Sequence, residues 1–159
     1  MTVMAAPSIH DVAIGLPLMV SLMTTVGTIL IHGLAVVVIV HFIRRRHRLG
    51  GIGIGFRQDV AIVCTATLLV SAAHLFEITI WALVFVFCGE FAQFAGAFYH
   101  SATNYTTLGY GDVVMSSSWK LLGPLEAADG MLMFGVSTAI IVSLIQLMVR
   151  TRFRDLPNF

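Results

Sequence analysis

A polar stretch that contains glycines, HSATNYTTLGYGDVV at residues 100–114, lies between two strongly apolar segments of the chain. It holds three threonines, one aspartate and two glycines that flank a tyrosine. Lipid cannot hydrogen-bond non-helical backbone, so such backbone occurs at membrane depth only where protein buries it or where it lines a water-filled path. The chemistry that this stretch offers is therefore that of backbone oxygens, hydroxyl groups and one carboxylate.

The composition of the chain indicates that a membrane surrounds this stretch. Hydrophobic residues make up 58% of the 159 residues and charged residues only 11%, against roughly 25% charged residues in soluble domains. The mean hydropathy of +0.94 favours an integral membrane protein over a soluble helical bundle. A net charge of +1 gives no sign of a nucleic-acid partner. Cys64 and Cys88 lie in apolar runs, which favours packing over a disulfide.

Three apolar segments are long enough to cross a bilayer, at about residues 12–43, 60–88 and 125–149. A hydrocarbon core of ~30 Å requires ~20 helical residues, so each segment suffices. The N-terminus lacks the basic region of a cleaved signal peptide, so we expect the first segment to be retained. Residues 89–124 are too polar to cross and too apolar for an ordinary exposed loop.

Basic residues predict the orientation of the spans. RRRHR at residues 44–48 follows the first span, and Arg150, Arg152 and Arg154 follow the third. Both clusters are expected on the cytoplasmic side, with the N-terminus and residues 89–124 outside and Lys120 as an exception. The arginines of the first cluster are contiguous, which favours an orientation signal that can contact anionic lipid over a voltage sensor. GGIGIG at residues 50–55 is expected to be a turn, since no strand precedes it.

Residues 90–105, EFAQFAGAFYHSATNY, have the alanine and aromatic content of a short helix, and TTLGYGD follows directly at 106–112. A helix that enters from outside, stops partway and returns as an extended strand fits this order. With an apolar segment on each side, the arrangement resembles the tetrameric pore-loop potassium channels of the two-transmembrane, Ion_trans_2-like family, whose pattern is T-T-[V/I]-G-Y-G-D. The resemblance covers about residues 60–150 and leaves the first span unexplained.

Together with the three apolar spans, the resemblance implies an all-α membrane protein with three transmembrane helices, a re-entrant pore helix and a filter loop. It also implies assembly as a fourfold homotetramer in membrane lipid. Such a protein would conduct K⁺ passively, would not be an enzyme and would need no cofactor besides K⁺ ions in the filter. The expected parts are an extra N-terminal helix with its basic end (1–48), a glycine-rich linker (49–59), a pore domain (60–150) and a short tail (151–159). Within the pore domain we expect the outer helix at 60–88, the pore helix at 91–105, the filter at 106–112 and the inner helix at 125–150.

The resemblance also assigns roles to residues of the loop. A dehydrated cation exchanges its water for a set of oxygens, which backbone carbonyls supply when they point the same way. The expected filter comprises Thr106, Thr107, Leu108, Gly109, Tyr110 and Gly111, with K⁺ held by Thr107, Leu108, Gly109 and Tyr110. The two glycines accept unusual dihedrals, and Tyr110 is expected to brace the strand against surrounding helices. Asp112 is expected to bond Tyr99, where many relatives carry tryptophan, with His100 and Asn104 as further supports. Leu108 replaces the usual valine or isoleucine.

The third span would be the pore-lining helix. Its expected cavity-facing stripe comprises Leu132, Gly135, Val136, Ala139 and Ser143. Gly130 and Gly135 flank the position where the family often carries a hinge glycine, and a hinge and close helix packing are equally compatible with them.

Four ionisable residues lie in or beside the spans: His74 and Glu77 on the second, and Glu126 and Asp129 on the third. Each pair is three residues apart and so shares a helix face, and buried charge in a membrane requires a partner. A polar collar that holds the pore helix, with Asn104 and His100 as partners, is favoured over a pH-sensitive gate, and a zinc site at His74 and Glu77 would need further ligands. His32 and His41 are interpreted as packed or snorkelling residues, in a first helix that we expect against the outer helix.

Three alternatives stay open. A weakly selective cation channel would share this architecture, a subunit of a potassium uptake transporter would carry degenerate filter loops, and a non-conducting membrane scaffold would leave the glycines unexplained.

Overall fold

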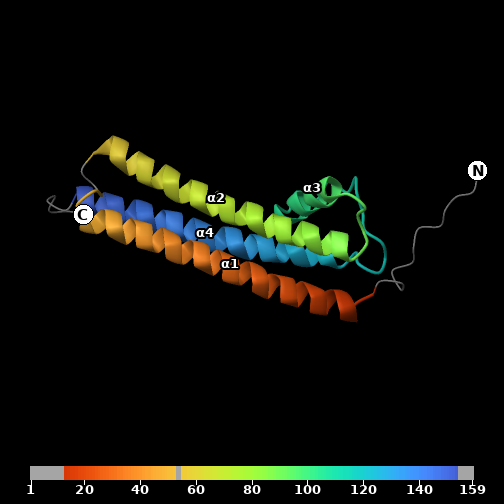
Figure 1. Cartoon of the computed structure of the whole chain (residues 1–159). Helices are drawn as coiled ribbons and strands as arrows, with labels where there is room; N and C mark the ends of the chain where they lie inside the picture. Colours follow the sequence, from red (N-terminus) through yellow and green to blue (C-terminus); the bar gives the residue numbers. More distant parts are fainter. Residues whose placement is uncertain (1–12, 53–54, 154–159) are drawn as a thin grey trace, which may run out of the picture. The chain divides into compact units, whose positions relative to one another are not determined.

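The computed structural model describes residues 13–52 and 55–153. These residues form four α-helices and no strand: α1 (Gly15–Arg48), α2 (Phe56–Phe87), α3 (Phe94–Tyr105) and α4 (Leu122–Arg152) (Figure 1). Three of them, α1, α2 and α4, are long and apolar enough to span a membrane. The chain is thus an all-α membrane protein. Arg154, the rest of the tail and the first twelve residues lie outside the described range.

The long helices expose apolar side chains, which is the arrangement that lipid favours and water does not. Met23 is 75% exposed in α1, Leu68 is 70% exposed in α2 and Met131 is 59% exposed in α4. At ~1.5 Å per residue, helices of 31 to 34 residues are longer than the ~30 Å hydrocarbon core.

The extra turns of α1 and α2 carry charged residues. α1 continues through the basic residues to Arg48, and α2 begins at Phe56, so that Arg57 and Asp59 lie in its first turn. A helix satisfies its own backbone at the membrane surface as well as within it. Both helices can therefore continue past their apolar runs into the polar interface. Because α1 ends at Arg48 and α2 begins at Phe56, the linker between them is shorter than the expected 49–59.

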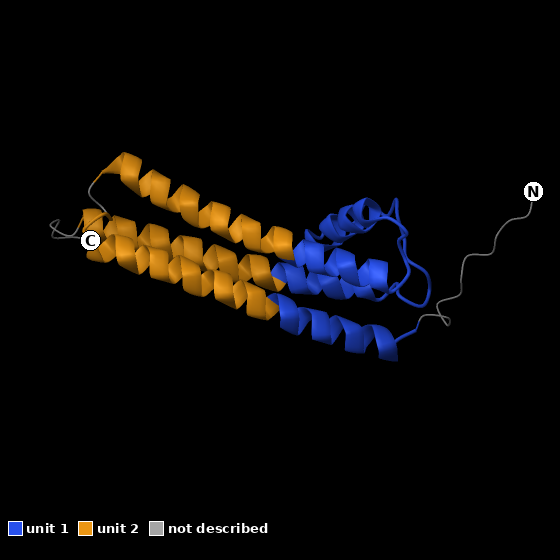
Figure 2. Cartoon of the chain, viewed as in Figure 1, with its two compact units in different colours: residues 1–28, 77–131 blue, residues 29–76, 132–159 orange. Residues whose placement is uncertain are grey.

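The chain divides into two compact units (Figure 2). Unit 1 comprises residues up to 28 together with 77–131, and unit 2 comprises residues 29–76 and those from 132 onward. Unit 1 holds α3 and the segments on either side of it, together with the adjoining parts of the three long helices. Its core includes Trp81, Phe85, Tyr105 and Leu122, which are fully buried.

Unit 2 is built from the remaining parts of the three long helices. Its core is hydrophobic and combines residues of all three helices with Ile52 of the linker: Ile39, Ile52, Ile62, Ala66, Val70, Leu144 and Met148. One ion pair joins α4 to the first turn of α2, with Arg152 Nη2 and Asp59 Oδ2 2.8 Å apart. The first helix was expected against the outer helix, and in this unit α1 contacts α2 at His32 and His74. It also contacts α4, where His32 lies against Ser137.

Candidate functional site

The segment 106–109 folds back on the end of α3 through its backbone amides. Thr106 N–H donates to Ala102 O at 3.2 Å and Thr107 N–H to Asn104 O at 2.8 Å. The amides of Leu108 and Gly109 both donate to Thr103 O, at 2.9 and 3.0 Å. Four successive N–H groups are thus taken by carbonyls of the helix. The segment is held by its donors, which leaves its own carbonyl oxygens to other partners.

The sign of φ alternates along the same segment. Thr107, Gly109 and Gly111 have φ of 60°, 51° and 74°, while Leu108 and Tyr110 lie outside the positive region. When right- and left-handed residues alternate, successive N–H groups gather on one side of the chain and the carbonyls gather on the other. The positive φ at the two glycines was expected from the sequence, but that at Thr107 was missed, since a left-handed conformation costs a residue with a Cβ roughly 1–2 kcal/mol.

The side chains of the segment are exposed within one chain. Leu108 is 55% exposed and Tyr110 is 67% exposed, and Thr106, Thr107, Gly109 and Gly111 are also exposed. Tyr110 was expected to brace the strand against helices. Helices of its own chain leave most of this side chain uncovered, so close packing around Tyr110 would require another copy.

A hydrogen bond links α3 to the far end of the segment. Tyr99 Oη donates to Asp112 Oδ2 at 2.8 Å, which is the contact that the resemblance to the pore-loop channels implied. The other carboxylate oxygen of Asp112 accepts from the amide of Val113 at 3.1 Å. The hydrogen bond to Asp112 raises the pKa of the Tyr99 hydroxyl above its usual value, so the tyrosine stays a donor at neutral pH.

His100 is buried among aromatic rings behind the segment. Its ring centroid lies 5.5 Å from that of Phe85 and 5.2 Å from that of Phe91, and its Nε2 is 3.0 Å from Asn104 Nδ2. Burial lowers the pKa of His100, and the charges of Asp112 and Glu90 act in the opposite direction. A neutral ring, with Nε2 accepting from the Asn104 amide, fits these surroundings.

Acidification is therefore expected to destabilise the protein through His100. Its pKa in the folded protein lies below the ~6.5 of an unfolded chain, so only the unfolded chain gains this proton as the pH falls through that value. Stability is fully present above about pH 6.5 and is lost below it. The melting temperature of the purified protein should fall between pH ~7.5 and ~5.5, and it should fall less in His100→Gln. Equal falls in the two proteins would remove His100 as the group responsible.

Three buried carboxylates in unit 1 receive hydrogen bonds from side chains. Tyr105 Oη donates to Glu77 Oε2, and Ser101 Oγ donates to Glu126 Oε1 at 2.5 Å. Asp129 Oδ2 accepts from Trp81 Nε1 at 2.9 Å and from Thr28 Oγ1 at 2.8 Å. Sequence reasoning identified the acids but missed Tyr105, Ser101, Trp81 and Thr28 as donors. No spacing rule could find them, because each lies on a different helix from its acid.

The bonds of Glu77 and Glu126 tie both flanking helices to α3, because Tyr105 and Ser101 belong to that helix. The bond of Asp129 reaches α1, which the sequence left without a role. Unit 1 therefore holds α3 between α2 and α4 by buried polar contacts, with α1 attached to α4 at Thr28.

His74 lies in unit 2 and shares a partner with His32. Ser137 Oγ is 3.0 Å from His74 Nε2 and 3.1 Å from His32 Nε2, and the two ring centroids are 5.2 Å apart. A neutral imidazole presents one donor and one acceptor nitrogen, and a hydroxyl carries one hydrogen. Ser137 can therefore donate to one ring while it accepts from the other, which joins α1, α2 and α4.

The residues expected to line the pore are all exposed within the chain: Leu132, Gly135, Val136, Ala139 and Ser143. Three of them, Val136, Ala139 and Ser143, border a groove whose other wall is formed by Val36, Val40 and Ile43 of α1. Gly130 differs from Gly135, since a Cβ at Gly130 would meet the carbonyl of Tyr105 whereas a Cβ at Gly135 would meet nothing within 4 Å. Close packing accounts for Gly130.

An all-α chain with three span-length helices is a multi-pass membrane protein. Residues 73–147 match the model of the Ion_trans_2 family, which is described as an ion channel. The match includes α3, the 106–112 segment and the part of α4 up to residue 147, and it leaves out α1. No curated protein and no solved structure matches the chain.

Proposed function

We propose that the chain is one subunit of a homotetrameric potassium channel, which conducts K⁺ passively through the carbonyl oxygens of residues 107–110. The observation that carries the proposal is the alternation of φ along TTLGYGD, directly after a short helix. This alternation turns successive carbonyls to one side, and a line of such oxygens can replace the hydration shell of a cation. The ion channel family of residues 73–147 fits the same activity.

The same geometry supports an assembly of several subunits, for which we propose four. One chain provides one strand of carbonyls, and a ring of oxygens around an ion needs several strands about one axis. The exposed side chains of Leu108 and Tyr110 would then be covered by neighbouring subunits. On this proposal α3 is the pore helix, and the partial negative charge of its C-terminal end, at Tyr105, favours a cation in the cavity below the filter.

The pore-lining stripe on α4 and the supports Asp112, Tyr99, His100 and Asn104 keep their expected roles in this proposal. The hydrogen bond between Tyr99 and Asp112 would hold the outer end of the filter against the pore helix. The basic ends of α1 and α4 favour a cytoplasmic location for both. Such a subunit is not an enzyme, since passive conduction needs no bond to form or break.

Ion flux from proteoliposomes tests the proposal. Purified protein reconstituted into vesicles should pass K⁺ down its gradient and pass Na⁺ at a rate lower by at least ~100-fold, a difference of roughly 2.7 kcal/mol between the ions. Comparable Na⁺ flux would favour a weakly selective cation channel, for which the Leu108 substitution is the specific sequence feature. Absence of flux for both ions would contradict the proposed channel function. Crosslinked products no larger than dimers would contradict the proposed tetramer.

A further inference from the structure

The basic end of α1 lies outside the channel family match, and the proposed path of the ion does not include it. The apolar run of α1 ends at Ile43, and residues 44–48 then carry four arginines and a histidine. All five are exposed. In a membrane helix, charged residues directly after an apolar run lie at the level of the lipid headgroups. This end of α1 therefore lies where phosphate groups are concentrated.

The last turn of α1 is closed by two glycines. Gly50 has φ of 67°, its amide donates to His47 O at 3.0 Å, and the amide of Gly51 donates to Arg46 O at 2.9 Å. This pair of bonds is a Schellman motif, which needs a left-handed residue at the position of Gly50. A Cβ on Gly51 would lie 3.3 Å from Arg46 O, so the returning chain packs directly against Arg46.

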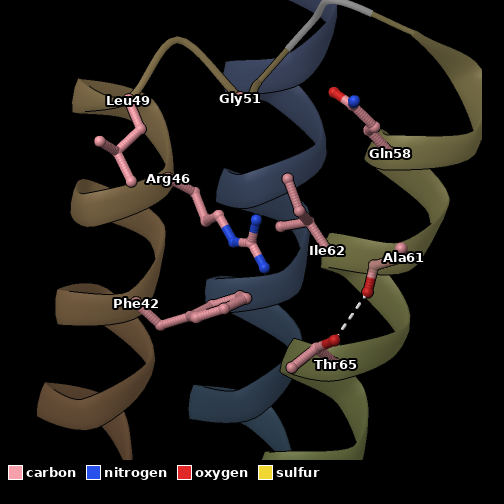
Figure 3. A pocket seen from close by; sticks show the side chains of 8 residues that line it. All are labelled: Phe42, Arg46, Leu49, Gly51, Gln58, Ala61, Ile62 and Thr65. Atoms are coloured by element: carbon pink, nitrogen blue, oxygen red, sulfur yellow. Dashed lines mark hydrogen bonds between the residues drawn. The ribbon is translucent and has the colours of Figure 1, made fainter.

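A pocket of about 340 Å³ opens beside Arg46 in unit 2, between α1 and α2 (Figure 3). Its polar side chains include Arg46 and Gln58, and Phe42, Leu49 and Ile62 give it apolar walls. The guanidinium carbon of Arg46 lies 5.5 Å from the centroid of the Phe42 ring, a contact that holds the cation over the aromatic face.

The charge of Arg46 is not matched by an acid in this pocket. Among its described lining residues none is acidic, and the acid in the first turn of α2, Asp59, forms an ion pair with Arg152 at 2.8 Å. Within the described residues, the Arg46 guanidinium has no hydrogen bond or ion pair. A cation held over an aromatic ring, with an amide and apolar walls around it, is suited to a ligand that carries both an anionic group and hydrocarbon.

We propose that this pocket binds an anionic phospholipid, with its phosphate at Arg46 and Gln58 and its hydrocarbon over Phe42 and Ile62. The charge of the neighbouring arginines complements an anionic lipid surface, and each such residue contributes ~1 kcal/mol near it. Arginine also matches a phosphate with two parallel N–H groups. The residues that line the pocket, of which Phe42 is the first and Thr65 the last, precede the family match, and binding there does not depend on ion conduction.

Native mass spectrometry of the full chain in a non-ionic detergent tests the proposal, with phosphatidylglycerol and phosphatidylcholine as the added lipids. Wild-type protein should bind phosphatidylglycerol in preference to phosphatidylcholine. Arg46→Ala should weaken phosphatidylglycerol binding about fivefold and leave phosphatidylcholine binding unchanged. Arg44→Ala is the matched control, because it removes the same charge two residues away at a side chain that does not line the pocket. It should change binding less than about twofold.

A second variant separates shape from charge. Ala61 lines the pocket, so Ala61→Leu should reduce phosphatidylglycerol binding by filling the site with the net charge unchanged, even if Arg46→Ala fails to fold. Equal losses in Arg46→Ala and Arg44→Ala would show diffuse attraction to the basic cluster and overturn the pocket. Unchanged binding in Ala61→Leu would also overturn it. Displacement of the lipid by an excess of inorganic phosphate would show a free-anion site instead.

Discussion

Replacing Gly130 with alanine is expected to destabilise the protein more than any other single methyl group added to α4. The new Cβ would lie 2.1 Å from the carbonyl oxygen of Tyr105 and 2.9 Å from its carbonyl carbon. These are backbone atoms at the end of α3, so no rotamer change can relieve the clash. Overpacking costs ~1–3 kcal/mol, and more where the neighbours cannot move. We expect a loss at or above the upper end of this range, measured as a lower melting temperature in detergent.

Gly135→Ala is the matched control on the same helix. A Cβ at Gly135 meets nothing within 4 Å, and alanine favours a helix over glycine by ~1 kcal/mol. This variant should melt at the wild-type temperature or above it. Equal destabilisation by the two substitutions would mean that α3 does not approach α4 at Gly130. It would return Gly130 to the role of a possible hinge.

Replacing Gly109 with alanine is expected to reduce K⁺ flux by about tenfold or more while the protein stays folded. Gly109 has φ of 51°, a conformation that costs an L-residue ~1–2 kcal/mol. A Cβ there meets nothing within 4 Å, so the substitution acts through the backbone angle rather than through a clash. A residue that leaves the left-handed region turns its carbonyl away from the others. Flux from proteoliposomes and the helix content of the same preparation measure the two effects.

Gly33→Ala provides the control for this substitution. A Cβ at Gly33 would also meet nothing within 4 Å, but Gly33 lies in α1 and its φ is not positive. The variant should conduct like the wild-type protein. If Gly109→Ala conducted equally well, the carbonyl of this residue would not be a ligand of the ion, and the proposed filter would be lost with it.

The first helix is part of the polar framework that positions the loop. In unit 1, Thr28 of α1 donates a hydrogen bond to Asp129, and Asp129 also accepts a hydrogen bond from Trp81 of α2. In unit 2, His32 of α1 contacts the Ser137 that His74 of α2 also contacts. A buried polar group without a partner costs several kcal/mol in an apolar surrounding, so these partners require α1 to keep its register along α4.

The sequence by itself determined that the chain is an all-α membrane protein and pointed to the candidate site. Long apolar runs predict membrane helices because only intrachain hydrogen bonds satisfy a backbone in lipid. The same rule makes TTLGYGD stand out, and the need for left-handed residues predicted the conformation of Gly109 and Gly111. The contact between Tyr99 and Asp112 was also predicted, from the resemblance of this segment to the pore-loop channels.

Only the tertiary structure decided the partners that come from other helices. The donors to Glu77, Glu126 and Asp129 lie 25 to 101 residues away from their acids, and no periodicity within one helix encodes such a pairing. The positive φ of Thr107 depends on the end of α3, which takes the amides of residues 106–109. The packing of Gly130 on Tyr105 likewise depends on where α3 stops against α4. Helix periodicity fixes which residues share a face, but contacts between helices are set by how the faces pack.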